Sequence, residues 1–162
     1  MKLLVVYCSI ALFSLTANAT TCNTGCVQNY TYFSSTTGWA GSWFSKSTSF
    51  CSRTAGSWLD LAKAAQNSSQ TTNNFIVANY ITTYLNYETA GACASLAMKV
   101  MVAAMRTNYM VPAQNPNHSV CTGGVDSFNA LLVSSRSTWA TAFYNYVTGV
   151  DHGPELCSPP SI

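Results

Sequence analysis

Seven side chains in this sequence could act as an acid or a base near neutral pH: Asp60, Glu88, His118, Asp126, Asp151, His152 and Glu155. A hydrolytic carboxylate pair needs two acids that face one cleft, but Asp60 and Asp126 are expected to cap helices, and Glu88 to face solvent. A serine nucleophile needs a positioned histidine, and adjacency of Asp151 and His152 in the chain does not by itself form a triad. We therefore predict no catalytic residue and no enzyme. An enzyme that uses Glu88 or Asp151 with His152 is the least favoured alternative.

Cysteine is the other reactive residue type, and its use depends on the compartment. Residues 1–19 are typical of a secretory signal, because Lys2 precedes an apolar run from Leu3 to Leu15 and Ala17-Asn18-Ala19 offers small residues for cleavage. Cys8 would leave with that signal. Six cysteines then remain. An even number of cysteines in a secreted chain predicts about three disulfides, with about fifteen possible connectivities. The six remaining cysteines are Cys22, Cys26, Cys51, Cys93, Cys121 and Cys157.

The signal also fixes the expected localisation. Its apolar run is shorter than the roughly 20 residues that a membrane span requires, and no later stretch is more suitable. We expect a secreted, extracellular protein that begins near Thr20 and has no membrane span. Cys22 and Cys26 could suggest a metal pair, but disulfides are favoured in this context, so we predict no metal and no cofactor. Three sequons predict N-glycosylation at Asn29, Asn67 and Asn117.

Charge is scarce: 7% of the residues are Asp, Glu, Lys or Arg, against about 25% in an ordinary soluble domain. Without Lys2, six basic and five acidic residues remain. This balance argues against a nucleic acid partner, which requires clustered Lys and Arg. Little charge repulsion would oppose association between copies. The candidate contact residues are the aromatic side chains Tyr30, Tyr32, Trp39 and Trp43.

Residues 73–109 contain two helical patterns that the rest of the chain must pack around. Val77, Ile81, Tyr84 and Leu85 recur at helical spacing in the first pattern. Gly91 is expected to end that helix in the left-handed conformation, and Cys93 lies in the joint. In the second pattern the apolar residues are expected to form one broad face, in which a central stripe is widened by flanking residues. The stripe is Met98, Met101, Val102 and Met105, and the flanking residues are Leu96, Val100, Ala103 and Ala104.

The remaining segments predict a mainly α fold, a single disulfide-stapled helical domain of three to four helices with an irregular aromatic N-terminal segment. Ser57 and Asp60 resemble a capping box for a helix that ends before Asn67. Asp126 is expected to cap a last helix over 127–147, after a loop at 109–124, and residues 27–33 alternate like a short strand. The predicted organisation is a signal (1–19), an irregular segment (20–56), a helical core (57–149) and an extended tail (150–162) tied by Cys157.

Four short motifs follow one another between residues 36 and 92: Thr36-Thr37-Gly38-Trp39, Ser57-Trp58-Leu59, the run 74–81, and Tyr84-Leu85-Asn86 before Gly91-Ala92. Their order is similar to a helical extracellular module of bacterial and other surface proteins. That module has charged and proline residues after its first Trp, where this chain has Ala40-Gly41-Ser42. The resemblance implies an extracellular surface or structural component, and it supplies no catalytic residue.

Together these patterns predict a non-enzymatic structural or interaction subunit of an extracellular surface, matrix or fibre. Its partners would be further copies, other extracellular proteins or glycans. One alternative is a secreted lipid or sterol carrier with a closed cavity lined by Met98, Met101, Val102 and Leu132. A secreted carbohydrate-binding protein is a further alternative.

Overall fold

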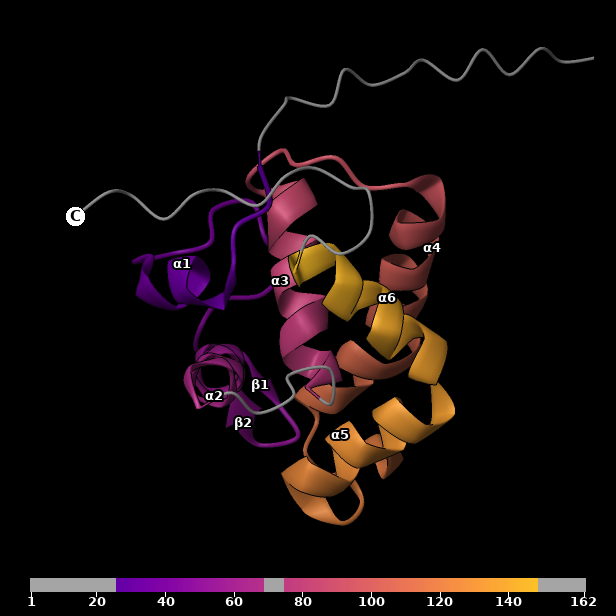
Figure 1. Cartoon of the computed structure of the whole chain (residues 1–162). Helices are drawn as coiled ribbons and strands as arrows, with labels where there is room; N and C mark the ends of the chain where they lie inside the picture. The colour runs from indigo at the N-terminus through magenta and orange to yellow at the C-terminus, as the bar shows by residue number, and fades with distance from the viewer. Residues whose placement is uncertain (1–25, 69–74, 149–162) are drawn as a thin grey trace, which may run out of the picture.

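The computed structural model describes residues 26–68 and 75–148 (Figure 1). Over these residues the chain is mainly helical, as the sequence predicts, and one short hairpin accompanies the helices. The elements are α1 (Tyr30–Ser35), β1 (Ser49–Phe50), β2 (Arg53–Thr54), α2 (Ala55–Asn67), α3 (Ile76–Glu88), α4 (Leu96–Met105), η2 (Arg106–Met110, a π-helix), η3 (Pro112–Gln114) and η4 (Ser119–Cys121), both 3-10 helices, α5 (Gly124–Ser135) and α6 (Ser137–Thr148).

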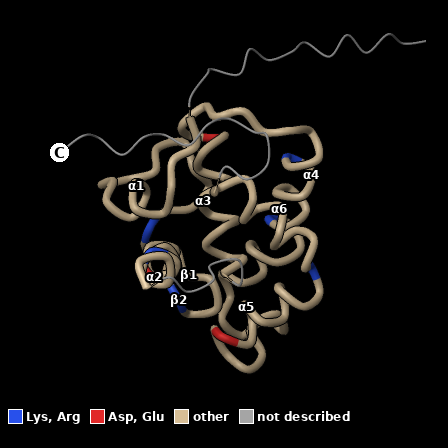
Figure 2. The backbone as a smooth tube through the Cα atoms, in the orientation of Figure 1, with Lys and Arg blue, Asp and Glu red and all other residues tan. Residues whose placement is uncertain are grey.

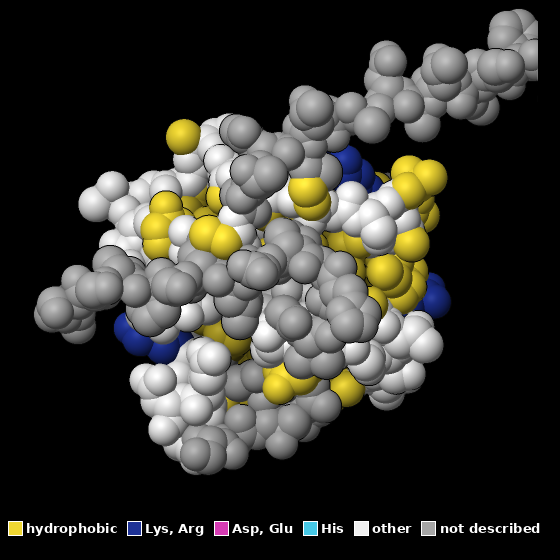
Figure 3. All heavy atoms as spheres, turned by 45° about the horizontal axis from the view of Figure 1, so that its top comes forward, with side chains coloured by type: hydrophobic (Ala, Val, Ile, Leu, Met, Phe, Trp, Pro, Cys, Tyr) yellow, Lys and Arg dark blue, Asp and Glu magenta, His cyan; other side chains and the backbone are white. Residues whose placement is uncertain are grey.

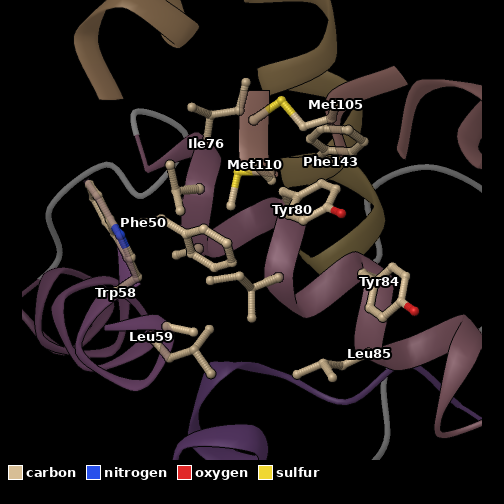
Figure 4. Close-up of a cluster of buried hydrophobic side chains, with 14 of the residues drawn as sticks. Phe50, Trp58, Leu59, Ile76, Tyr80, Tyr84, Leu85, Met105, Met110 and Phe143 are labelled. Carbon is tan, nitrogen blue, oxygen red and sulfur yellow. The ribbon is translucent and has the colours of Figure 1, made fainter. Parts of the chain in front are cut away.

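Helix α3 is the centre of the fold. It contacts α1, α2, α4, α5 and α6, and every residue from Ile76 to Asn86 is buried. Gly91 follows with φ +70°, the left-handed conformation expected at the helix end. Apolar side chains from the surrounding elements close on α3 (Figure 4). The largest fully buried side chains include Phe50, Trp58, Leu59, Tyr80, Leu85, Met105, Met110, Phe128 and Phe143.

Buried polar groups on α3 hold the N-terminal segment. The Asn86 Nδ2 group donates to Gln28 O at 2.9 Å, and Gln28 N donates to Asn86 Oδ1 at 2.6 Å. The Tyr30 hydroxyl donates to Asn79 Oδ1. The strand predicted over 27–33 is wrong, because Asn29 Oδ1 accepts from Tyr32 N and caps α1.

The aromatic segment between α1 and α2 is irregular, as predicted, and ends in the β1–β2 hairpin. At its tip, Cys51 forms a disulfide with Cys121, and Cys51 N donates to Ala113 O at 2.7 Å. The hairpin is therefore fixed to the segment that follows η2. Cys26 and Cys93 each take part in a disulfide as well. Cys22 and Cys157 lie outside the described residues, as do the predicted signal and residues 150–162.

Two predicted helix boundaries are wrong. Thr54 caps α2, because its Oγ1 accepts from Ser57 N at 3.3 Å, and Asp60 instead accepts from Ser34 Oγ at 2.6 Å. The last predicted helix is two helices, α5 and α6, broken at Arg136. Asp126 lies in the first turn of α5 but does not cap it, since Gly123 occupies the cap position.

The predicted loop at 109–124 is more regular than expected. It contains the end of η2, then η3 and η4, and it buries Ala113. No helix in residues 26–68 and 75–148 has both the length and the apolar character needed to cross a membrane.

Candidate functional site: the outer face of α4 and the groove beside it

Helix α4 has apolar side chains on two opposite faces. Ser95 caps it by accepting from Met98 N at 3.1 Å. Met98, Val102 and Met105 point into the core and are 6%, 1% and 0% exposed. Leu96 and Val100 point outward and are 79% and 59% exposed. The single broad face expected from the sequence is therefore wrong, because the flanking residues lie on the solvent side.

We call the exposed row Leu96, Val100, Ala103 and Thr107 the outer stripe. Its members are four, three and four residues apart, and all four are exposed. This spacing places them along one side of a helix, in the pattern by which helices pair in coiled coils. In Figure 3 hydrophobic side chains gather on the right of the molecule, where Figure 1 places α4. A helix that is apolar on both faces is typical of a helix that is buried on both.

A groove of about 410 Å³ lies beside the C-terminal half of the outer stripe. We call it the α3–η2 groove. Ala103 and Thr107 belong both to it and to the outer stripe, so the two form one continuous surface. The π-helical turn of η2 carries Arg106 and Thr107, and such turns are frequent at functional sites. The groove is lined by Tyr84, Tyr87, Glu88, Val102, Ala103, Arg106, Thr107 and Val111.

Aromatic rings support the wall of this groove. The Arg106 guanidinium lies 4.8 Å from the centre of the Trp43 ring, which contacts the Tyr84 ring at 6.4 Å. The Tyr84 and Tyr87 rings are 5.9 Å apart. Burial, with the Glu88 charge adding to it, raises the pKa of the Tyr84 and Tyr87 phenols, so both stay neutral at physiological pH. Glu88 and Arg106 therefore supply the charges at an otherwise neutral groove.

A second groove of about 410 Å³ lies between the start of α2 and α5. Arg53 spans it, because its Nη2 is 3.7 Å from Asp126 Oδ1 and its guanidinium lies 4.7 Å from the centre of the Trp58 ring. Its charged groups are thus already in contact with each other. In the α3–η2 groove, by contrast, Glu88 forms no salt bridge with any described residue.

The predicted contact residues do not form one surface. Tyr30 and Trp39 are 1% and 8% exposed and belong to the core, so they are not available to a partner in this fold. Trp43 is half-buried beneath Arg106, and only Tyr32, 43% exposed on α1, faces solvent as expected.

The predicted glycosylation sites differ in exposure. Asn67 and Asn117 are exposed, while Asn29 is half-buried as the α1 cap. His118 caps η4 by accepting from Val120 N at 3.2 Å. Within the described residues, no three His, Cys, Asp or Glu side chains converge as a metal site would require. Asp151, His152 and Glu155 lie outside these residues.

Sequence reasoning did not identify the outer stripe as a site, although it named three of its four residues. The signal was present in the spacing of Leu96, Val100 and Ala103, but a periodic pattern does not say which of two apolar faces is turned inward. Comparison with known proteins finds no matching family model, no similar curated protein and no similar solved structure. The surface of this chain itself is therefore what indicates its function.

Proposed function

We propose that this protein is a secreted, glycosylated, non-enzymatic subunit of an extracellular surface, matrix or fibre, and that it associates with its partners through the outer stripe of α4. The observation that carries the proposal is the exposure of Leu96 and Val100 at 79% and 59%. Large apolar side chains gathered on one face are typical of interaction sites.

The remainder of the surface supports the same function. Charged residues are sparse and scattered along the described chain (Figure 2), so little repulsion would oppose close packing of subunits. The Cys51–Cys121 disulfide suits an oxidising compartment. Asn67 lies at the end of α2 and Asn117 before η4, both exposed, so neither sequon is itself part of the outer stripe.

A lipid or sterol carrier is the alternative. Of the residues proposed to line its cavity, Met98, Val102 and Leu132 are buried in the packed core, and Met101 packs against it. Neither groove described above is lined by Met98, Met101 or Leu132. This arrangement favours the interaction subunit over the carrier.

The test is the size distribution of the secreted, glycosylated protein across a concentration series, measured by sedimentation velocity and negative-stain microscopy. The wild type is expected to form dimers or larger assemblies, and the double variant Leu96→Glu, Val100→Glu to remain monomeric. Leu131→Glu is the matched control, because Leu131 is 47% exposed on α5 rather than α4, and it should assemble like the wild type. A wild type that is monomeric at every concentration would refute the proposal.

A further inference from the structure

The outer stripe and the α3–η2 groove together form a surface that complements itself. Among the described residues, Leu96 is the most exposed of the large hydrophobic side chains, and it lies at the N-terminal end of the stripe. The groove borders Ala103 and Thr107 at the other end. Seven to eleven residues separate these positions, which corresponds to roughly 10–17 Å along a helix. One surface therefore carries a projecting side chain and, a few turns away, a hollow.

A projection and a hollow on one face match each other when two copies meet across a two-fold axis. With the axis crossing the stripe between Val100 and Ala103, two α4 helices would run antiparallel. Val100 of each copy would then face Ala103 of the other. Leu96 of each copy would face Thr107 of the other, at the border of the groove. The small side chain of Ala103 would let the helices approach closely.

An ion pair that only a second copy could supply favours a second copy as the occupant. Lys99 and Arg106 are seven residues apart, so they project from nearly the same side of the helix, and Arg106 lines the groove. In an antiparallel pair this side faces the same side of the second copy. Lys99 would therefore reach the groove of the other copy, where it would lie between the negative Glu88 and the positive Arg106. Glu88 and Lys99 are both exposed, and neither forms a salt bridge within residues 26–68 and 75–148.

We propose that the protein forms a two-fold symmetric dimer in which Leu96 of each copy docks into the α3–η2 groove of the other and Lys99 of each pairs with Glu88 of the other. This proposal rests on the proposed function and names the partner at that site. One helix seam and two small grooves form an interface at the low end of the usual size range, so we expect a dissociation constant on the order of micromolar or weaker.

The first experiment is a charge exchange between Glu88 and Lys99, measured by sedimentation of the secreted full-length protein. Glu88→Lys should raise the dissociation constant about tenfold, since it places like charges in contact twice per dimer, and Lys99→Glu should raise it less, because Arg106 of the other copy would attract the new carboxylate. The double variant should return to within about threefold of wild type, because the pair is restored with reversed polarity. Lys63→Glu on α2 is the matched control and should change little. Two single effects without rescue would overturn the Glu88–Lys99 pairing.

The second experiment locates Leu96 directly. A photo-crosslinking amino acid at position 96 should join two copies, and mass spectrometry should find the crosslink in the peptides that carry Tyr87, Ala103 or Thr107. Leu96→Glu should weaken the dimer about 30-fold or more, as expected for an apolar anchor that fills a groove on the partner. A dimer that survives Leu96→Glu would overturn this geometry and leave the proposed function standing. An absence of any wild-type association would refute both.

Discussion

Asn86 joins two segments that are far apart in the sequence. It is fully buried on α3, and its amide both donates to and accepts from the backbone of Gln28. It donates to Thr82 O as well, at 2.8 Å. The Asn86 side chain thus pairs with both the N–H and the C=O of Gln28, as the backbone of a neighbouring strand would. Burial without such partners would be costly.

Replacing Asn86 should therefore destabilise the fold strongly. Asn86→Ala would leave the N–H and C=O groups of Gln28 without their partner, and we expect a loss of about 2–4 kcal/mol in the free energy of unfolding. The measurement is urea denaturation. Gln66→Ala, at an exposed position of α2, is the control and should change stability by less than about 0.5 kcal/mol. A loss below about 1 kcal/mol for Asn86→Ala would contradict this role.

Buried tyrosines should make the protein sensitive to alkaline pH. Burial raises the pKa of Tyr146 from 10.0 to about 12, and its hydroxyl donates to Cys93 O at 2.9 Å. Since the folded state favours the neutral phenol, this contribution to stability is complete below pH 10 and is lost as the pH rises through about 12. Urea midpoints should fall across that window.

Tyr146→Phe isolates the effect. The variant should be less stable than the wild type at neutral pH, because Cys93 O loses its donor, and its stability should decrease less steeply above pH 10. Burial also raises the pKa values of Tyr80, Tyr84 and Tyr87. The stability of the variant should therefore still depend on pH in the alkaline range. Wild-type stability that does not change above pH 10 would exclude this mechanism.

At the scale of elements, one side chain at the break between α5 and α6 contacts both α6 and η2. Arg136 Nε donates to the Tyr109 hydroxyl at 3.0 Å, and the guanidinium lies 4.8 Å from the centre of the Trp139 ring. Arg136 therefore links the two helices to η2. Its backbone is also outside the helical region, with φ −132° and ψ 42°.

Arg136→Lys should weaken this junction. Lysine keeps the charge but loses the planar group that bonds Tyr109 while covering Trp139, and we expect a loss of about 1–2 kcal/mol. Thermal unfolding measures it. The control is Lys99→Arg, the reverse exchange at an exposed site of α4, which should not change the stability of the monomer. Equal stability of Arg136→Lys and wild type would show that packing alone sets the break.

The sequence predicts a helix best where the side marked by its apolar spacing is also buried in the core. Helix α3 was predicted almost to its ends, because Val77, Ile81 and Leu85 keep one period and the whole helix is buried. The break at Arg136 was missed because the apolar period continues through it from Leu132 to Trp139. Helix α1 was missed because Asn29, a good cap, was interpreted within a strand-like alternation. Caps and breaks depend on single residues, which a periodic pattern averages out.

At the scale of the whole molecule, the Cys51–Cys121 disulfide closes a loop with a sequence separation of 70 that contains α2, α3 and α4. Closing a loop of this length restricts the unfolded chain and is expected to stabilise the fold by about 4 kcal/mol. Cys51→Ala with Cys121→Ala should lose a comparable amount in urea denaturation. A loss below about 1 kcal/mol would mean that hairpin packing, including the Cys51 N to Ala113 O bond, suffices to hold the segments together.

The fold class and the disulfide bonding of Cys51 and Cys121 could be derived from the sequence, whereas the candidate site could not. Tyr30 and Trp39 were interpreted as surface aromatics, but both are buried beside α3 or α1. Leu96 and Val100 are predicted to widen a single apolar face together with Met98 and Val102, but they lie on the opposite, exposed side of the helix. Each error has the same origin: hydrophobicity predicts that a side chain will be covered, and only the arrangement of the helices decides whether its own chain covers it.

The complete burial of α3 from Ile76 to Asn86 has a consequence for how the molecule opens. Each amide proton of a helix exchanges with solvent through the least costly opening that exposes it. Because other elements surround α3, its central amides have no local route to solvent. They should exchange only when the whole domain unfolds, while those on the outer side of α4 exchange far sooner. The slowest protons of the protein would then report its global stability under native conditions.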